Sequence, residues 1–269
     1  MTLLGRLLAE PLRRDRVVVG ATLAILGALA WAYTGFLAWQ MERIGTSAPP
    51  DMAAEMAGMW MAMAAPWSAA QWGLMIVMWF VMMVAMMLPS AAPMILTFAR
   101  INRSRAAAGE PTAATGLFLA GYLLVWLGFS AAAAAGQFAL QTATLATMDM
   151  TVTPTLGGAL LIAAGLFQFT DLKQACLAKC RTPVGFVIAH WREGHIGAFV
   201  MGAHHGGYCL ICCWALMALL FVFGVMNLLW IAGLAALVLA EKLLPAGERI
   251  AKLTGLPLIG AGIWLLVGG

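Results

Sequence analysis

Long apolar runs, separated by short polar and basic segments, make up most of this 269-residue chain. A helix needs about 20 apolar residues to cross the hydrocarbon core of a bilayer, and several runs reach that length. The pattern predicts an all-α fold, namely a polytopic transmembrane helical bundle of about seven spans. The expected spans are 17–39, 73–98, 113–138, 154–170, 197–224, 227–244 and 255–269.

The composition supports a membrane protein. Hydrophobic residues make up 63% of the chain and charged residues only 10%, whereas about a quarter of the residues in a soluble domain are charged. We therefore expect a single transmembrane helical domain over 17–269, after a basic cytoplasmic segment over 1–16. The apolar run from Val17 to Trp39 is longer than the ~7–15 residues of a cleaved signal, so we interpret it as an uncleaved anchor.

The basic residues predict the orientation of the chain. Cytoplasmic loops of membrane proteins carry an excess of lysine and arginine. With the N-terminus in the cytoplasm, fourteen of the fifteen basic residues lie on the inner side, Lys173 and Lys242 among them, and only Arg43 lies outside. This distribution indicates a multi-pass membrane protein with the lipid bilayer as its partner. No basic groove with interleaved aromatics is present, which argues against nucleic acid.

The segment 171–213 contains all five cysteines and all four histidines of the chain. Cys176 and Cys180 are four residues apart, so on a helix they share one face. At 3.6 residues per turn, four further side chains fall within roughly 100° of arc on the fifth span, while His204 points elsewhere. These four are His205, Cys209, Cys212 and Cys213.

The two groups together predict a metal site near the cytoplasmic face. The segment between Arg181 and Ile196 could fold back and join them. Thiolates and imidazole suit zinc, Cu(I) or another soft metal, and the reducing cytoplasm disfavours disulfides. Asp171 or Glu241 could accept a hydrogen bond from a ligand, although Glu241 could instead pair with Lys242. The predicted metal ligands are Cys176, Cys180, His205, Cys209, Cys212 and Cys213.

Other interpretations of the cysteines stay open. Cysteine packs well as a small hydrophobe, so the chain could be an assembly or anchoring subunit with structural cysteines. Cys209 and Cys212 also have the spacing of a redox dithiol, which is typical of a membrane thiol oxidoreductase. The pair faces the reducing side and no quinone motif is visible, so we expect a binding protein rather than an enzyme. His190 and His195 lie in a polar loop, where we expect them to be solvated.

Nineteen methionines are concentrated in two places. One is the predicted outer loop 40–72, and the other is a stripe along the second span that leads towards Pro89. Thioethers can collect Cu(I), so the two groups could form a copper relay, although methionine stripes also serve as packing. The residues are Met52, Met56, Met59, Met61 and Met63 in the loop, then Met75, Met78, Met82, Met83, Met86 and Met87 in the span.

Several sequence blocks carry a family resemblance. They are MMVAMMLPSAAPM, FQFTDLKQACLAKCRTPVGFVIAHW, HHGGYCLICCWALMALLFVFGVMNLLW and AEKLLP. With these blocks the chain resembles, over roughly residues 75–265, a bacterial family of predicted metal-binding integral membrane proteins. The resemblance implies metal binding by the cysteines and histidine that match the family's blocks, which are the six predicted ligands.

These observations lead to one functional hypothesis. We expect an inner-membrane protein that binds a metal ion at the Cys/His site, with copper favoured over zinc because of the methionines. Its role would be metal transport, or delivery to a metal-receiving membrane protein. A thiol-rich site should lose its metal at low pH, since the ligands must be deprotonated to bind.

Overall fold

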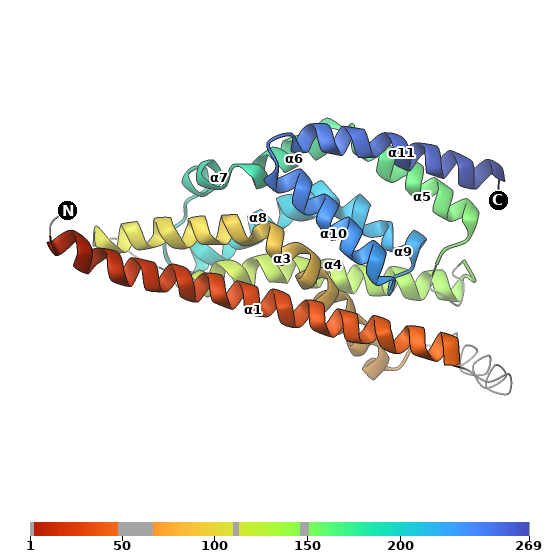
Figure 1. Ribbon diagram of the computed structural model, residues 1–269, viewed down its shortest axis with the longest axis horizontal. Coiled ribbons are helices and arrows are strands. Elements are labelled where there is room, and N and C mark those ends of the chain that lie inside the picture. Colours follow the sequence, from red (N-terminus) through yellow and green to blue (C-terminus); the bar gives the residue numbers. More distant parts are fainter. Residues whose placement is uncertain (1–2, 48–66, 110–112, 146–150, 269) are drawn as a thin grey trace.

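The structure is a computed structural model that describes residues 3–47, 67–109, 113–145 and 151–268. Its long helices run broadly along one axis and form a bundle, which confirms the all-α class (Figure 1). The helices are α1 (Leu3–Ser47), α3 (Ala69–Ala107), α4 (Thr115–Thr142), α5 (Pro154–Phe167), α6 (Asp171–Arg181), α7 (Pro183–Ala189), α8 (Gly194–Ala218), α9 (Leu220–Phe223), α10 (Leu228–Leu243) and α11 (Gly247–Gly268).

The seven predicted spans all fall on helices, but not all of these helices are long enough to cross a membrane alone. Among the described residues, α1, α3, α4, α8 with α9, and α11 are long and apolar enough. The pair α5 and α6, bent by 64° at its break, makes a sixth if it counts as one broken span. Helix α10 has 16 residues, or about 24 Å at 1.5 Å per residue. The number of spans is therefore approximate.

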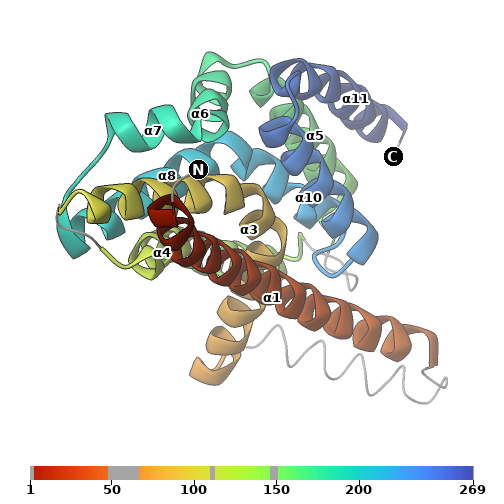
Figure 2. The ribbon, with the colours of Figure 1, turned by 60° about the vertical axis from the view of Figure 1, so that its left-hand side comes forward.

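The region after the fourth predicted span is more helical than expected. The span predicted at 154–170 ends at Phe167, and the chain turns at residues 168–170 into α6. The Thr170 side chain accepts a hydrogen bond from the Lys173 backbone N–H and so caps α6. The segment predicted to be a fold-back loop contains α7 (Figure 2). Pro183 at its first turn has no N–H to leave unpaired, which suits a helix start.

Helices α4 and α8 approach each other closely through glycines. A Cβ atom added to Gly202 would lie 1.9 Å from the carbonyl oxygen of Phe118, and one added to Gly121 would lie 2.0 Å from that of Phe199. Only glycine fits at such contacts, and small residues are the usual means of packing membrane helices tightly. The close approach holds the middle of α8 against α4.

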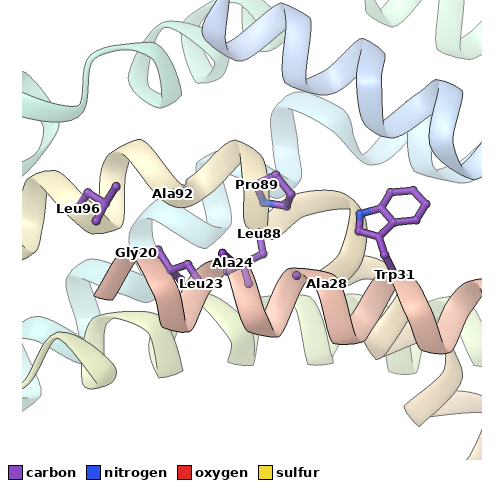
Figure 3. Close-up of a pocket in the computed structure, with 10 residues that line it drawn as sticks. Gly20, Leu23, Ala24, Ala28, Trp31, Leu88, Pro89, Ala92 and Leu96 are labelled. Atoms are coloured by element: carbon purple, nitrogen blue, oxygen red, sulfur yellow. The ribbon is translucent and has the colours of Figure 1, made fainter. Parts of the chain in front are cut away.

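Helix α3 packs against α1, α4, α7 and α10 and is bent near Pro89 (Figure 3). Proline lacks an N–H and its ring clashes with the preceding turn, so Pro89 and Pro93 disturb the backbone bonding there. The Met87 carbonyl accepts hydrogen bonds from Ser90 Oγ at 2.9 Å and from Tyr122 Oη at 3.3 Å. The bend is thereby tied to α4 at the level of Met87.

The groove between α1 and α3 is apolar. It encloses about 340 Å³ and is lined by residues such as Leu23, Trp31, Leu88 and Pro89 (Figure 3). Its lining contains no charged, cysteine or histidine side chain. The groove therefore offers none of the thiol or imidazole groups that the sequence analysis proposed as metal ligands.

A short turn returns the chain from α9 to α10, as the sequence predicts. Gly224 adopts φ +94°, a conformation that favours glycine. The Asn227 side chain then accepts a hydrogen bond from the Trp230 backbone N–H and caps α10. The resulting hairpin brings the C-terminal end of α10 back towards the middle of α8.

Candidate metal centre

Four thiols meet where α6 packs on α8. Helix α8 supplies Cys209, Cys212 and Cys213, and α6 supplies Cys180. The Cys180 thiol lies within interaction range of the thiols of Cys209 and Cys212, and so does the Cys213 thiol. All four are free and buried. We call these four residues the thiol cluster.

The remaining predicted ligands lie beside the thiol cluster. Cys176 is buried on α6, close enough to Cys212 for the two thiols to influence each other electrostatically. His205 lies one helical turn before Cys209 and is 2% exposed. Among the described residues, neither of its ring nitrogens has a hydrogen-bond partner, which is rare for a buried polar group. The neighbouring His204 is exposed, in agreement with the helical spacing.

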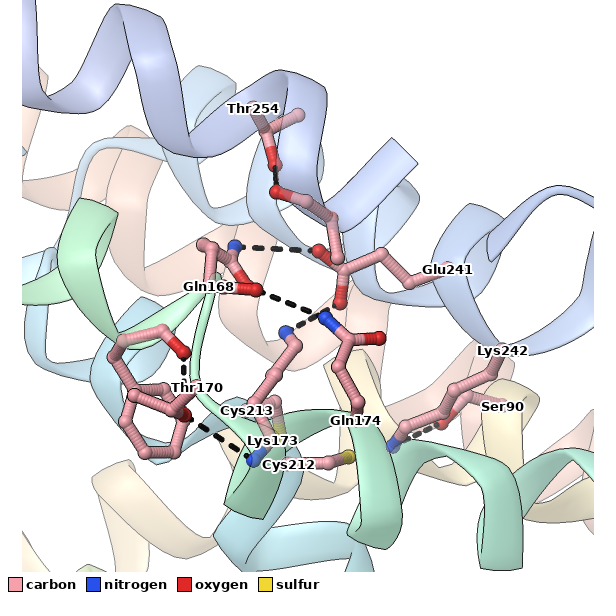
Figure 4. Close-up of polar contacts among 12 residues, drawn as sticks. Ser90, Gln168, Thr170, Lys173, Gln174, Cys212, Cys213, Glu241, Lys242 and Thr254 are labelled. Atoms are coloured by element: carbon pink, nitrogen blue, oxygen red, sulfur yellow. Dashed lines mark hydrogen bonds and ion pairs between the residues drawn. The ribbon is translucent and has the colours of Figure 1, made fainter. Parts of the chain in front are cut away.

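Lys242 is the cation of the thiol cluster. Its Nζ donates hydrogen bonds to Cys209 Sγ at 2.9 Å and to Ser90 Oγ at 3.3 Å, the latter drawn in Figure 4. Tyr122 Oη lies 3.3 Å from the same sulfur. The sequence interpretation counted Lys242 among the charges of the inner side, within the span predicted at 227–244, and did not foresee that its side chain is buried in the bundle.

A buried ion pair lies next to this cation. Lys173 Nζ donates to Glu241 Oε2 at 2.7 Å, and the side chains are 0% and 1% exposed (Figure 4). Gln168 Nε2 donates to the other carboxylate oxygen at 3.3 Å. Glu241 thus pairs with Lys173 on α6 rather than with the adjacent Lys242. Asp171, the other candidate acceptor, is exposed at the start of α6.

The thiol cluster lies deeper along α8 than expected. The helix begins at Gly194, so Cys209 is fifteen residues, or roughly 22 Å, from its N-terminal end. The sequence interpretation placed this residue in the first turns of the span. Because α6 folds back along α8, Cys180 reaches this depth even though it follows the break after α5.

One methionine belongs to the same site. The Cys213 thiol lies 3.8 Å from Met87 Sδ, at the bend of α3. The neighbouring Met82, Met83 and Met86 are also buried. Met75 and Met78, nearer the start of α3, are partly buried. The methionines that the sequence analysis assigned to an outer loop lie outside the described residues. They are Met52, Met56, Met59, Met61 and Met63.

The donor set suits a soft metal, although its thiols are engaged elsewhere. The thiols of Cys212 and Cys213 donate to the Cys209 carbonyl oxygen at 3.1 and 2.9 Å. In the described ranges no group of three or more His, Cys, Asp or Glu side chains is arranged so that it could hold a metal ion without a change of side-chain conformation. Thiolate and thioether donors favour Cu(I). Copper could be held here once these thiols lose their protons and turn away from the carbonyl.

The sequence interpretation missed the cationic and hydroxyl groups of the site. A signal for Lys242 was present, since it falls inside the span predicted at 227–244, where an ionisable side chain points to a function or a buried partner. No pattern in the sequence distinguished Ser90 or Tyr122, because their roles depend on the bend of α3 and on the packing of α4.

Comparison with known proteins gives one informative match. Neither the curated proteins nor the solved structures contain a match to this chain. The model of the PpoB2 family, described as a copper chaperone, matches residues 76–265. This range is well over half of the chain and includes the thiol cluster, His205, Met87 and Lys242. It supports a copper-related role and gives no support to zinc. The chain belongs to the PpoB2 family of copper chaperones.

Proposed function

We propose that this protein is a copper carrier of the bacterial inner membrane, oriented with its N-terminus in the cytoplasm. It holds Cu(I) at the thiol cluster and delivers the ion to another membrane protein. The family supports the metal, the apolar helices support the membrane location, and the basic residues support the orientation.

The observation that carries this proposal is the meeting of four free thiols inside an apolar bundle. Single cysteines pack easily in such an interior. Here, however, the thiols contact one another and lie with a thioether, a cation and an imidazole that has no hydrogen-bond partner. Polar and ionisable groups are costly at this depth, so a cluster of them indicates a ligand.

Charge balance explains the place of Lys242. Cu(I) bound by two thiolates carries one net negative charge, and the ammonium group 2.9 Å from Cys209 Sγ supplies one positive charge. A neutral site avoids most of the cost of placing charge in a medium of low dielectric constant. The thioether of Met87 can add a neutral donor without changing this balance.

The proposed ligand set follows from these contacts. Two thiols of the cluster bind Cu(I) as thiolates, and His205 is an additional nitrogen donor. The candidates for the two thiolates are Cys180, Cys209, Cys212 and Cys213. Cys176, the sixth predicted ligand, lies beside the set and could take up the ion as it moves. Binding requires the thiols to be deprotonated, so copper should be lost at low pH.

The thiol oxidoreductase has less support. An enzyme of that kind needs a thiolate that its substrate can reach. Cys209 and Cys212 are each 1% exposed. Trapping of free thiols in membranes, with and without oxidant, would test it, and a Cys209–Cys212 pair that cycles between reduced and disulfide forms would favour the enzyme.

The first test of the proposal is the metal content of the purified protein. The wild-type chain, prepared in mild detergent under reducing conditions, should retain about one equivalent of copper. The Cys209→Ser/Cys212→Ser variant should retain almost none, whereas His195→Ala, a change at an exposed position, should behave as wild type. Copper-free wild-type protein that also fails to bind added Cu(I) would contradict the proposal.

A further inference from the structure

Two histidines from different helices face each other outside the thiol cluster. His190 follows α7 as its C-terminal cap, and His204 lies on the exposed side of α8. Their ring centroids are 6.3 Å apart and their planes are nearly perpendicular, at 80°. The fourth histidine, His195, is exposed at the start of α8 and has no comparable contact with either ring in the part of the chain described.

The two rings are close enough for one metal ion to reach both. A metal binds an imidazole nitrogen at about 2.0–2.1 Å, which places it roughly 3.2 Å from the ring centroid. Two rings on opposite sides of one ion then have centroids about 6.4 Å apart in a linear arrangement. The observed 6.3 Å is within this limit, although the contact between His190 and Tyr208 has the same centroid distance.

The hydrogen bond of His190 prepares one of its nitrogens for a metal. His190 Nδ1 lies 3.0 Å from the Phe186 carbonyl oxygen. Since a carbonyl oxygen can only accept, Nδ1 carries the hydrogen and donates it, which leaves the Nε2 lone pair available in the neutral ring. Histidine ligands of metals usually hold their second nitrogen in this way. The ring also stacks on Phe186, with centroids 4.7 Å apart, which fixes its orientation.

Aromatic contacts connect this pair to the buried site. Phe186 contacts His190 on one side and His205 on the other, at centroid distances of 4.7 and 5.6 Å. His205 follows His204 directly in α8 and precedes Cys209 by one turn. Its ring nitrogens have no hydrogen-bond partner in the part of the chain that the structure describes. Imidazoles are thus placed in succession from the exposed side of α8 to the thiol cluster.

We propose that His190 and His204 form a second, peripheral copper site, at which Cu(I) is held by two imidazoles on its way to or from the thiol cluster. His205 is the intermediate donor between the two sites. The inference rests on the proposed function, since it takes copper as the ion carried. Two neutral donors bind Cu(I) more weakly than thiolates do, which suits a site of exchange.

The test uses the full-length protein in detergent, titrated with Cu(I) against a colorimetric Cu(I) chelator under reducing conditions. Wild-type protein should bind one tight and one weaker equivalent. The His190→Ala and His204→Ala variants should each lose the weaker equivalent and keep the tight one. His195→Ala, the matched control, should keep both. X-ray absorption at the second equivalent should show two nitrogen donors at about 2 Å in wild type only.

The outcomes separate this site from the thiol cluster. A weaker equivalent that persists in His190→Ala, or that His195→Ala removes equally, would overturn the histidine site while leaving the thiol site intact. Loss of the tight equivalent in Cys209→Ser/Cys212→Ser, with the weaker one retained, would support both sites. Absence of the tight equivalent from wild type would overturn the proposed function instead. Absence of the weaker equivalent alone would overturn the histidine site.

Discussion

At the scale of single residues, Cys209 is the centre of the polar contacts inside the bundle. Its sulfur meets the ammonium of Lys242 at 2.9 Å and the hydroxyl of Tyr122 at 3.3 Å. Its carbonyl accepts from the thiols of Cys212 and Cys213. These partners lie on α4 (Tyr122), on the next turn of α8 (Cys212 and Cys213) and on α10 (Lys242). Cys209 therefore responds to changes in α4, α8 and α10 alike.

Removing the cation next to Cys209 should weaken copper binding. In Lys242→Met the side chain keeps much of its length but cannot balance a thiolate or a Cu(I)–thiolate group. We expect the affinity for Cu(I) to fall by about tenfold or more, because an uncompensated buried charge is costly. Lys242→Arg, which keeps the charge, should lose less. Affinity would be measured by competition with a Cu(I) chelator.

The matched control is Lys179→Met, which removes an exposed lysine from α6. It should leave the affinity unchanged. A Lys242→Met protein that binds Cu(I) as tightly as wild type would show that this ammonium group has no part in balancing the site.

At the scale of helices, an ion pair between α6 and α10 holds these two helices together beside the site. Lys173 on α6 and Glu241 on α10 form an ion pair that is almost fully buried. Cys180 lies seven residues after Lys173 on α6, and Lys242 follows Glu241 on α10. Because seven residues are about two helical turns, Lys173 and Cys180 share one face of α6. The ion pair thus sets where α6 presents its thiol.

The effects of Lys173 and Glu241 on the free energy of unfolding should depend strongly on each other. Lys173→Met leaves a buried carboxylate without its cation and should lower the free energy of unfolding by about 3–5 kcal/mol. The double variant Lys173→Met/Glu241→Leu removes both charges and should recover much of this loss. Thermal unfolding in detergent would measure both. Additive losses in the double variant would mean that the two side chains do not interact.

The close contact of α4 and α8 gives a second prediction for the helices. In Gly202→Ala the new methyl group would collide with the Phe118 carbonyl, so we expect a loss of about 1–3 kcal/mol, typical of overpacking. Gly207→Ala on the same helix meets no atom within 4 Å and should be neutral or stabilising by up to about 1 kcal/mol. Equal melting temperatures for the two variants would contradict the packing described.

At the scale of the whole molecule, hydropathy predicted where the helices lie but not how they meet. The seven apolar ranges all fall on helices because an apolar run of that length has few other structures available in lipid. The start of α11 at Gly247 was missed because Glu248, Arg249 and Lys252 make its first turns polar. The short α6 and α7 carry too few apolar residues for a hydropathy signal.

The candidate site was predictable only in part. The spacing of His205, Cys209, Cys212 and Cys213 identified one face of α8, and all four side chains are buried there. Their meeting with Cys180 and Lys242 depends on the break after α5 and on the hairpin before α10. Sequence spacing within one helix carries no information about such contacts between helices. The charge rule that predicted the orientation therefore counted Lys173 and Lys242 on the inner side without indicating that both side chains are buried.

The orientation of the chain can be tested directly. A reporter that functions only in the cytoplasm should be active at the N-terminus, and one that functions only outside should be active when inserted in the loop 40–72. The excess of lysine and arginine in the inner segments gives this direction. The opposite pattern of reporter activity would mean that the chain is inserted in the membrane in the opposite direction.

The central claim, that copper is held by the thiol cluster, is tested most directly by X-ray absorption of the protein loaded with one equivalent of Cu(I). The account predicts a first coordination shell dominated by sulfur. It also predicts that Cys209→Ser/Cys212→Ser loses most of that sulfur signal along with the copper. A shell made only of nitrogen and oxygen, or a sulfur signal unchanged in the variant, would contradict it.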